Sequence, residues 1–305
     1  MDPKKKFFSE GYWECYFRKA SNSILNPGNK VGKWNKLSIE RRYWCADPFP
    51  VHYRGEEYVF CEVMDRKKSY GMLGCGKLSE KGTTKISVIQ DIGCHTSYPD
   101  IFTWQDELYM IPETVERHTI ELYRCRRFPN QWEKITDLLT NTKAVDTTVF
   151  TYQDKIYLFV YEEFNGTCRL SLGELSMEKK TVENLRVVRQ YDQKIGRPAG
   201  RIIRKGEQYF RPTQYGVNFY GERIVFYEFT IDHVNGDLRY TEKEDMAIGI
   251  NDLEFENTGR FIGTHTYNYD NGYEVVDFCK KRFYPERPIL LILKKLGIGG
   301  YQFHG

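Results

Sequence analysis

The chain has 305 residues with 45 basic and 42 acidic side chains, so its net charge is only +3. This balance does not provide the concentrated basic surface that nucleic-acid binding needs, and an aromatic content of 15% is not typical of a disordered chain. The longest apolar run, 289–293, is far shorter than the roughly 20 residues of a membrane helix. Scarce alanine beside 23 Tyr, 19 Phe and 25 Gly favours strands over helices.

The N-terminus and the cysteines favour a cytoplasmic protein. The opening MDPKKKFFSEGYWE is basic but lacks the apolar core of a secretory signal. None of the eight cysteines forms a CxxC pair, so no metal site is indicated, and buried free thiols are expected rather than four disulfides. We therefore expect no transmembrane segment, no metal and no cofactor.

In chain order, the first predicted strand covers 12–18 and has no hairpin partner nearby. Four segments then align without gaps, at 46–62, 98–113, 146–161 and 198–213. Each contains a tyrosine, an apolar residue seven positions before it and a polar turn between the two, which predicts strand, tight turn and strand. We call these tyrosines the anchors: Tyr58, Tyr109, Tyr157 and Tyr209.

Further strands are predicted after each repeat. They lie at 73–78, 86–90, 120–126, 168–175 and 224–231, and the segment 132–139 is predicted as a short helix. A fifth, degenerate unit at 263–278 has its turn at Asp270, Asn271 and Gly272. Three or four strands thus recur about every 45–60 residues, which is the period of a propeller blade. A β-sandwich or a pair of β domains would leave the repeat unexplained.

The prediction is an all-β single domain over 1–305, a five-bladed β-propeller. Its blades are expected to begin near residues 44, 97, 145, 197 and 261. The strand 12–18 would complete the last blade and close the ring by pairing the two ends of the chain, which removes exposed sheet edges.

The repeat register also selects residues for the centre of the ring. The first strand of each blade lines the central channel of a propeller, and residues two apart share one strand face. Eleven positions before the anchors lie Asp47, Tyr98, Asp146 and Pro198, and nine before them lie Phe49, Asp100, Thr148 and Gly200. We predict Asp47, Asp100 and Asp146 as catalytic residues. The predicted ligand-binding residues are Tyr98, Glu113, Arg197, Arg201, Arg211 and His265.

Converging carboxylates beside arginines form the kind of polar pocket that suits a sugar. Paired carboxyl groups serve as acid and base in glycosyl chemistry, and crowding raises the pKa of one of them. One Asp at the start of a strand is more often a structural cap, and a lone His265 is more often a satisfied buried histidine. Glu62 and Glu113, four positions after their anchors, could line the channel, but ion pairs to an arginine explain them slightly better. The shared register of Asp47 and Asp146 is what favours function.

The phrases ADPF, SYP, ELYR, AVDTT, RPAGR and GTHT occur in this order between about residues 13 and 278. They resemble the N-terminal propeller domain of plant glucosamine inositolphosphorylceramide transferases and its bacterial stand-alone relatives. A more distant resemblance is to the five-bladed propellers of the furanosidase and invertase group. Both imply a five-bladed propeller, and the first implies a role in making a glycan or glycolipid. In the plant proteins the recognised glycosyltransferase domain is a separate C-terminal module.

The furanosidase resemblance implies a base or nucleophile at Asp47 and a second carboxylate at Asp146. The general acid of that group is a Glu in the fourth blade, where this chain has Arg197 and Arg201, and Glu207 lies beside the hairpin turn instead. Arginines suit phosphate, carboxylate or nucleotide-diphosphate groups because they bind them in a planar, bidentate way.

Three functions follow as hypotheses. The first is a glycosyltransferase-like enzyme that acts on an anionic or nucleotide-linked sugar. The second is a non-catalytic glycan-binding propeller that works beside a separate glycosyltransferase. The third is a furanosidase-type hydrolase with Asp47 as base or nucleophile and Asp100 or Glu113 as acid.

Overall fold

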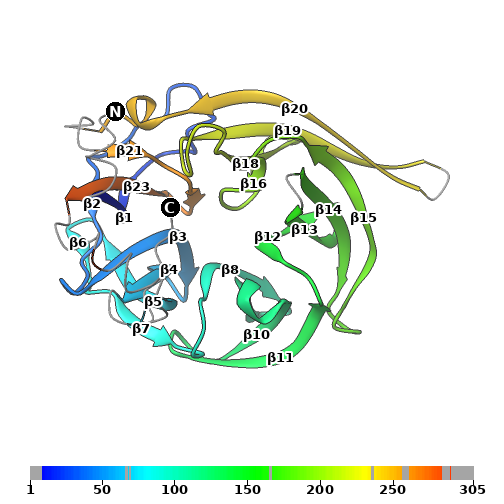
Figure 1. The fold of residues 1–305 in the computed structure, drawn as a ribbon, viewed down its shortest axis with the longest axis horizontal. Coiled ribbons are helices and arrows are strands. Elements are labelled where there is room, and N and C mark those ends of the chain that lie inside the picture. The colour runs from blue at the N-terminus through cyan, green and yellow to red at the C-terminus, as the bar shows by residue number, and fades with distance from the viewer. Residues whose placement is uncertain are drawn as a thin grey trace.

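The computed structural model describes residues 9–65, 68, 70–164, 167–234, 237–255, 261–283 and 289. Within these residues, five antiparallel sheets stand around one central axis (Figure 1). Besides strands there are two short 3-10 helices, η1 (Val115–Arg117) and η2 (Ile250–Leu253). The predicted five-bladed β-propeller is therefore confirmed. Among the described residues, no helix is both long enough and apolar enough to cross a membrane.

Each of the first three blades runs from an innermost strand outward in chain order. Blade one contains β3 (Tyr43–Tyr53), β4 (Glu56–Asp65), β5 (Gly71–Ser79), β6 (Gly82–Thr83) and β7 (Ser87–Gln90). Blade two contains β8 (Ser97–Trp104), β9 (Glu107–Glu113), β10 (Thr119–Arg127) and β11 (Gln131–Thr140). Blade three contains β12 (Ala144–Tyr152), β13 (Lys155–Phe164), β14 (Thr167–Ser176) and β15 (Thr181–Tyr191).

The last two blades have an innermost strand that is broken into two pieces. Blade four contains β16 (Ile195–Pro198), β17 (Ile203–Lys205), β18 (Gln208–Tyr215), β19 (Arg223–Val234) and β20 (Asp237–Ile248). Blade five contains β21 (Phe261–Gly263), β22 (Tyr267–Asp270), β23 (Tyr273–Phe283), β1 (Ser9–Lys19) and β2 (Asn35–Lys36). All five blades begin within two residues of the positions expected from the sequence.

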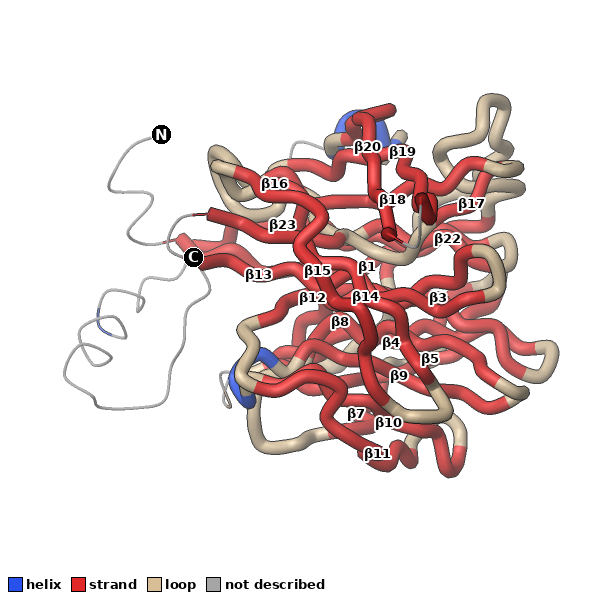
Figure 2. The backbone as a smooth tube through the Cα atoms, turned by 90° about the vertical axis from the view of Figure 1, so that its right-hand side faces the viewer, coloured by secondary structure: helices blue, strands red, loops and turns tan. Residues whose placement is uncertain are grey.

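The two ends of the chain close the ring. β1 pairs with β23 along eleven residues, from Ser9 opposite Phe283 to Lys19 opposite Tyr273. The closing strand is longer at both ends than the predicted 12–18. Figure 2 shows β16 on the side of the ring where β1 begins and β23 ends. We call this side, where β3, β8, β12 and β16 begin, the mouth face.

The segment 132–139, predicted as a helix, is instead part of β11, which pairs with β10. Three register shifts interrupt this pairing, the first between Ile120 and Glu121. Each bulge adds one residue to a strand, so inward side chains can be three rather than two positions apart. That spacing resembles the spacing of apolar residues in a helix. The segment is nevertheless a strand, because its backbone pairs with β10.

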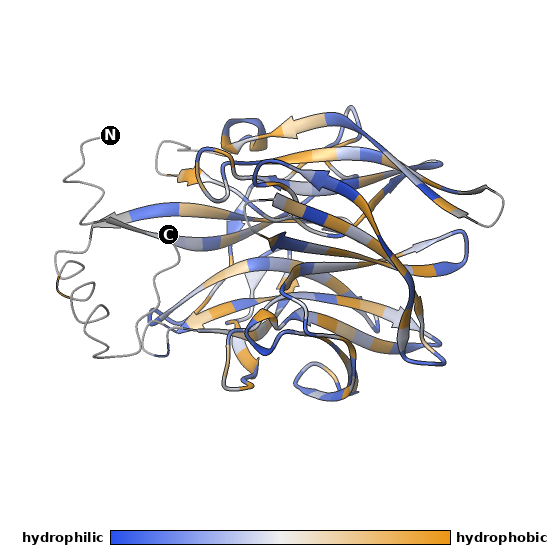
Figure 3. Ribbon diagram, turned by 45° about the vertical axis from the view of Figure 1, so that its right-hand side comes forward, coloured by the Kyte–Doolittle hydropathy of each residue, from blue (hydrophilic) through white to orange (hydrophobic). Residues whose placement is uncertain are grey.

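Apolar side chains pack between neighbouring blades. Figure 3 shows hydrophobic residues distributed over the strands of all the blades. Between blades three and four, for example, Phe150, Phe159 and Phe229 lie in one buried cluster. The anchors belong to these clusters: Tyr157 pairs with Phe150 across the hairpin and is 2% exposed. In blade four the hairpin register is shifted by one, so Phe210 rather than Tyr209 pairs with an apolar partner, Ile203.

All eight cysteines lie in the described part of the chain, and all are free thiols. Six of them are buried, including Cys15, Cys45 and Cys61 in the cluster between blades five and one. The expectation of buried free thiols is therefore confirmed for these six.

Candidate functional site

Three innermost strands share an unusual backbone conformation near the mouth face. Asp47, Tyr98 and Asp146 have φ values of 48°, 45° and 49°. Each sits where its strand gains one residue over its hairpin partner, that is, in a β-bulge. The left-handed conformation is unfavourable for residues with a Cβ, although aspartate tolerates it better than most. The repeated register in the sequence is therefore the register of a repeated bulge.

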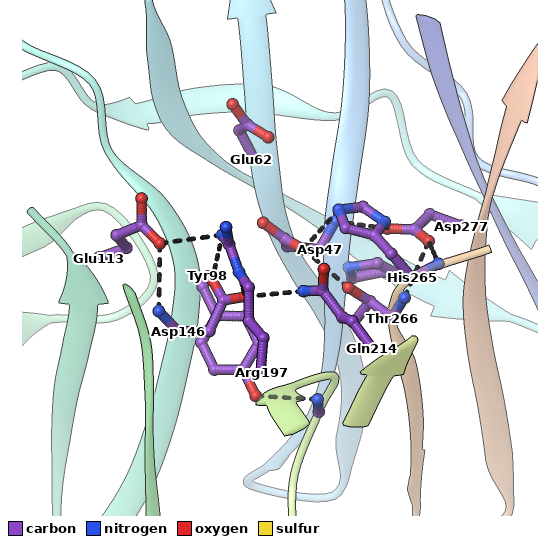
Figure 4. A network of polar contacts seen from close by, with 12 residues as sticks. Asp47, Glu62, Tyr98, Glu113, Asp146, Arg197, Gln214, His265, Thr266 and Asp277 are labelled. Carbon is purple, nitrogen blue, oxygen red and sulfur yellow. Dashed lines mark hydrogen bonds and ion pairs between the residues drawn. The ribbon is translucent and has the colours of Figure 1, made fainter. Parts of the chain in front are cut away.

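The bulge also changes which residues meet. Strict alternation would place Asp47 and Asp100 at one level of the channel, but the extra residue interrupts the alternation. Asp47 and Asp146 join one polar cluster, which we call the central cluster, whereas Asp100 belongs to a separate ion pair. The central cluster consists of Asp47, Glu62, Glu113, Asp146, Arg197, Gln214, His265, Thr266 and Asp277 (Figure 4).

One half of the central cluster is built around Arg197 of β16. Its Nε donates to Asp146 at 2.5 Å, and its Nη2 contacts the other oxygen of Asp146 at 3.1 Å and Glu113 at 3.3 Å. Glu113 also accepts from the backbone N–H of Asp146 at 3.1 Å, and Gln214 donates to Asp146 at 2.8 Å. The guanidinium is therefore held by two carboxylates, while its Nη1 makes none of these contacts.

The other half is an imidazole between two carboxylates. His265 Nδ1 lies 2.8 Å from Asp277, and its Nε2 lies 3.4 Å from Asp47. Asp277 also accepts from the backbone N–H groups of Asp47, His265 and Thr266. Burial alone would lower the pKa of His265, but the neighbouring Asp277 and Asp47 raise it. The ring is thereby favoured as a positively charged imidazolium between two carboxylates.

The carboxyl groups of the central cluster have raised pKa values. Burial raises the pKa of Asp47 from 3.8 to about 6, with His265 opposing the rise and Asp146 adding to it. Burial, together with the charges of Asp47 and Glu113, raises the pKa of Glu62 well above its usual range. Burial and Asp146 do the same for Glu113, against the opposing effect of Arg197. Burial thus shifts Glu62, Glu113 and Asp47 toward the protonated form, and the pKa of Asp47 lies at about 6.

Glu62 is only weakly paired in this cluster. Its side chain is 7% exposed, and its Oε1 lies 3.7 Å from Nε2 of His95 but makes no hydrogen bond among the described residues. In Figure 4 it stands above Asp47 without a dashed contact. A buried carboxyl oxygen without a hydrogen bond carries a desolvation cost, so Glu62 is a group that a ligand could satisfy.

Below the central cluster, Tyr98 and Arg201 join several blades. The hydroxyl of Tyr98 lies 2.8 Å from Thr148 and accepts from the backbone N–H of Gly200 at 2.8 Å. Arg201 contacts Asp100 at 3.1 Å and donates to the carbonyls of Pro50 at 2.6 Å and Ile101 at 2.8 Å. These contacts use all three guanidinium nitrogens of Arg201 on the protein itself.

Arg211, also predicted to bind ligand, lies outside the central cluster. It is fully buried between blades three and four, where it contacts Glu242 at 2.6 Å, the hydroxyl of Tyr191 at 2.9 Å and the carbonyl of Gly196 at 2.7 Å. The structure thus brings together five of the nine predicted residues, namely Asp47, Glu113, Asp146, Arg197 and His265.

Sequence reasoning missed Gln214, Asp277 and Tyr220. Gln214 follows Phe210 by four positions, as Glu62 follows Tyr58, so the one-residue shift in blade four hid it. Asp277 was visible as an acid between apolar residues in the strand sequence VVDF. Tyr220 lies in a loop, 5.6 Å from Arg197 and 5.1 Å from the ring of His265, and no repeat position points to it.

Among the described residues, one group has the donor types of a cation site: Asp47, His265 and Asp277 offer ligand atoms within 4.8 Å of one another. The two carboxylates are already paired with His265, and a protonated imidazole has no lone pair to give a metal. Asp100 adds no further oxygen ligand, because it is paired with Arg201. The arrangement is an ion-pair network as it stands.

These observations define a five-bladed β-propeller with a polar, carboxyl-rich centre. Residues 20–254 match the family described as "Glucosamine inositolphosphorylceramide transferase 1, N-terminal". The chain belongs to this family.

Curated relatives from rice and Arabidopsis carry the name glucosamine inositolphosphorylceramide transferase 1. The protein of Oryza sativa subsp. indica is 24% identical over 193 residues, which cover 60% of this chain and 26% of the relative. The protein of Arabidopsis thaliana is 30% identical over 157 residues, which cover 50% of this chain and 20% of the relative. The matched region is therefore about a quarter or less of the length of these relatives.

Solved structures with a similar fold include glycoside hydrolases. A thermostable family-43 glycoside hydrolase superposes with a TM-score of 0.56 at 10% identity, over 80% of this chain and 91% of the other. An α-L-arabinofuranosidase from Podospora anserina in complex with cellotriose gives 0.56 at 11% identity, over 89% and 97%. At such identities the likeness establishes the propeller fold alone.

Proposed function

We propose that the central cluster is the sugar site of a carbohydrate-active protein that takes part in making a glycan or glycolipid. One observation carries the proposal. Several carboxyl groups that differ in pKa lie together beside Arg197, whose Nη1 makes none of the contacts described above. Protonated Glu62 and Glu113 can donate to sugar hydroxyls, while Asp47 and Asp146 can accept from them. The name of the curated relatives supports a carbohydrate as the ligand.

The chemistry we propose is glycosyl transfer. Asp47, which titrates near neutrality, would accept the proton of the attacking acceptor hydroxyl. Glu113, whose pKa is raised, would give its proton to the oxygen that leaves the anomeric carbon. One C–O bond forms, one breaks, and the proton lost by Glu113 is balanced by the proton gained by Asp47.

The donor we propose is an anionic or nucleotide-linked sugar. Of the two arginines predicted for this role, Arg201 is fully used by Asp100 and two backbone carbonyls. Arg197 keeps its Nη1 for a ligand, and its side chain is 21% exposed. Of these two arginines, we therefore expect Arg197 to donate the charged hydrogen bond to the ligand.

A non-catalytic glycan-binding module is the second candidate. The pairing of Arg197 with both Asp146 and Glu113 favours it. These ion pairs hold the carboxyl groups and the guanidinium on one another, so they are less available to act as acid, base or charged donor in a reaction. Such a module would bind the glycan while a separate glycosyltransferase acted on it.

The test is a thermal-shift screen with nucleotide sugars and neutral glycans, followed by product analysis with each stabilising ligand. We expect a nucleotide sugar to stabilise the native protein and Asp154→Asn, a variant at an exposed hairpin turn, but to stabilise Arg197→Gln much less. Asp47→Asn should keep binding and lose turnover. Binding without turnover in the native protein would support the module, release of free sugar would support a hydrolase, and no stabilisation by any sugar would overturn the proposal.

A further inference from the structure

The loop 216–221, which we call the mouth loop, connects β18 to β19 beside the central cluster. Three of the exposed large apolar side chains of the described chain lie within it: Val217 at 38%, Phe219 at 44% and Tyr220 at 40%. Exposed apolar groups gathered beside a polar site are typical of ligand-binding surfaces. Neither the repeat nor the proposed acid–base chemistry requires them.

The mouth loop is held firmly in place. The backbone N–H of Gly216 donates to the carbonyl of Lys194 at 2.9 Å. Asn218 braces the loop from within, because its backbone and side-chain nitrogens both donate to Glu222, at 3.1 and 2.9 Å. Gly221 has φ +71°, and a Cβ there would stand 2.4 Å from Trp13, so blade five packs directly against it. The apolar side chains therefore stand on a preorganised support.

The loop is also continuous with the central cluster. The ring of Tyr220 lies 5.6 Å from the guanidinium carbon of Arg197, within cation–π range, and edge-on to His265 at 5.1 Å. Trp13 also packs on His265 at 3.9 Å and meets Tyr220 edge-on at 5.9 Å. A ligand held by Arg197 would thus have Tyr220, and then Phe219, as its next neighbours.

We propose that the mouth loop is a second sugar subsite, in which Phe219 and Tyr220 pack against the ring next to the one held in the central cluster. The inference rests on the proposed function and adds that the ligand has at least two sugar rings. A sugar ring has an apolar C–H face that packs on an aromatic side chain, and a rim of hydroxyls that Asn218 and Glu222 can meet. An acyl chain offers nothing to those two polar residues, so a sugar is the better occupant.

The experiment measures affinity by calorimetry for methyl glycosides of glucosamine, N-acetylglucosamine, mannose and arabinose, and for the disaccharide of each. For a sugar that binds, the disaccharide should bind the native protein about tenfold tighter, which corresponds to about 1.4 kcal/mol. Phe219→Ala should reduce this gain to less than about twofold without changing monosaccharide affinity. Phe219→Tyr should restore the gain.

Phe164→Ala is the matched control, because Phe164 is an exposed aromatic residue at the end of β13 in the neighbouring blade. It should keep the full disaccharide gain. Equal affinity for mono- and disaccharide, or a gain that survives in Phe219→Ala, would overturn the second subsite and leave the central sugar site standing. A gain seen with octyl glycosides in place of disaccharides would also overturn it, whereas no binding of any probe would reject the central site as well.

Discussion

At the residue scale, the centre of the ring holds more carboxyl groups than cations. Five carboxyl side chains meet Arg197 and His265 in the central cluster: Asp47, Glu62, Glu113, Asp146 and Asp277. Buried charges normally destabilise a fold unless they are fully paired. Raised pKa values at Asp47, Glu62 and Glu113 indicate that this pairing is incomplete. The site should therefore lower the free energy of unfolding, and replacing one of these carboxyl groups by a neutral side chain should raise it.

Asp47→Asn should stabilise the protein at neutral pH. The folded-state pKa of Asp47 is about 6 against an ordinary 3.8, so the folded protein holds this proton more tightly than the unfolded chain. Native stability therefore falls as pH rises from about 4 to about 6 and stays low above that, whereas asparagine does not titrate. We expect a gain of about 1–3 kcal/mol at pH 7.5 that disappears near pH 4. Urea unfolding at a series of pH values measures it, and a pH-independent difference would contradict the assignment.

Arg201→Ala should destabilise the fold at every pH where Asp100 is ionised. Its guanidinium joins Asp100 to the carbonyls of Pro50 and Ile101, so its loss leaves a buried carboxylate without its cation. We expect a loss of about 3–5 kcal/mol in the free energy of unfolding. Arg204→Ala removes an exposed pair with Glu207 and should cost less than about 1 kcal/mol. Similar midpoints for the two variants in denaturant would argue against a structural role for Arg201.

At the element scale, each blade begins with a strand whose regular ladder is interrupted near the mouth. In blade four the interruption is widest, since β16 and β17 are separate strands with Ala199, Gly200 and Arg201 near the middle of the break. The chain can pass close to blade five there only because Gly200 has no side chain: its φ is +136°, and a Cβ would stand 2.1 Å from the carbonyl oxygen of Tyr267.

Gly200→Ala should therefore be severely destabilising, by about 3 kcal/mol or more, because backbone strain and a backbone clash act together. Gly206→Ala is the matched control in the hairpin of the same blade. Gly206 also has a positive φ, +61°, but a Cβ there meets nothing within 4 Å, so about 1 kcal/mol is expected. Thermal unfolding of the two purified variants compares them directly, and equal losses would mean that the contact with Tyr267 does not limit this position.

At the scale of the whole molecule, β1 both completes blade five and closes the ring. It carries Trp13, which packs on His265 of the central cluster. Without β1, the edge of β23 would lie open along eleven residues, and such an edge pairs readily with other chains.

Removing residues 1–19 should therefore produce a protein that self-associates and unfolds without a sharp transition. Size-exclusion chromatography with light scattering would show the association, and a peptide of residues 9–19 added in excess should reduce it. Removal of 1–8 alone leaves β1 complete and is the control. A monomeric, cooperatively folded protein lacking 1–19 would show that closure is dispensable.

The sequence predicted the architecture better than it predicted the site. The anchors revealed the blades because hairpin turns and apolar pairs recur in the linear order of the chain, as at Tyr157 and Phe150. The site depends on bulges and on contacts between blades, which have no such local pattern. Asp100 was therefore placed with Asp47 when it belongs with Arg201, and Gln214 and Asp277 went unnoticed.

The layer beneath the central cluster determines how a ligand can move. Phe49 and Tyr98 are fully buried, and Arg201 reaches from blade four to blades one and two, so side chains fill the axis there. This layer favours approach to the central cluster from the mouth face rather than through the ring. A glycan bound there, as proposed, would enter by one of its ends and withdraw by the same route. We therefore expect the protein to recognise chain termini or branch tips and to release its ligand completely between encounters.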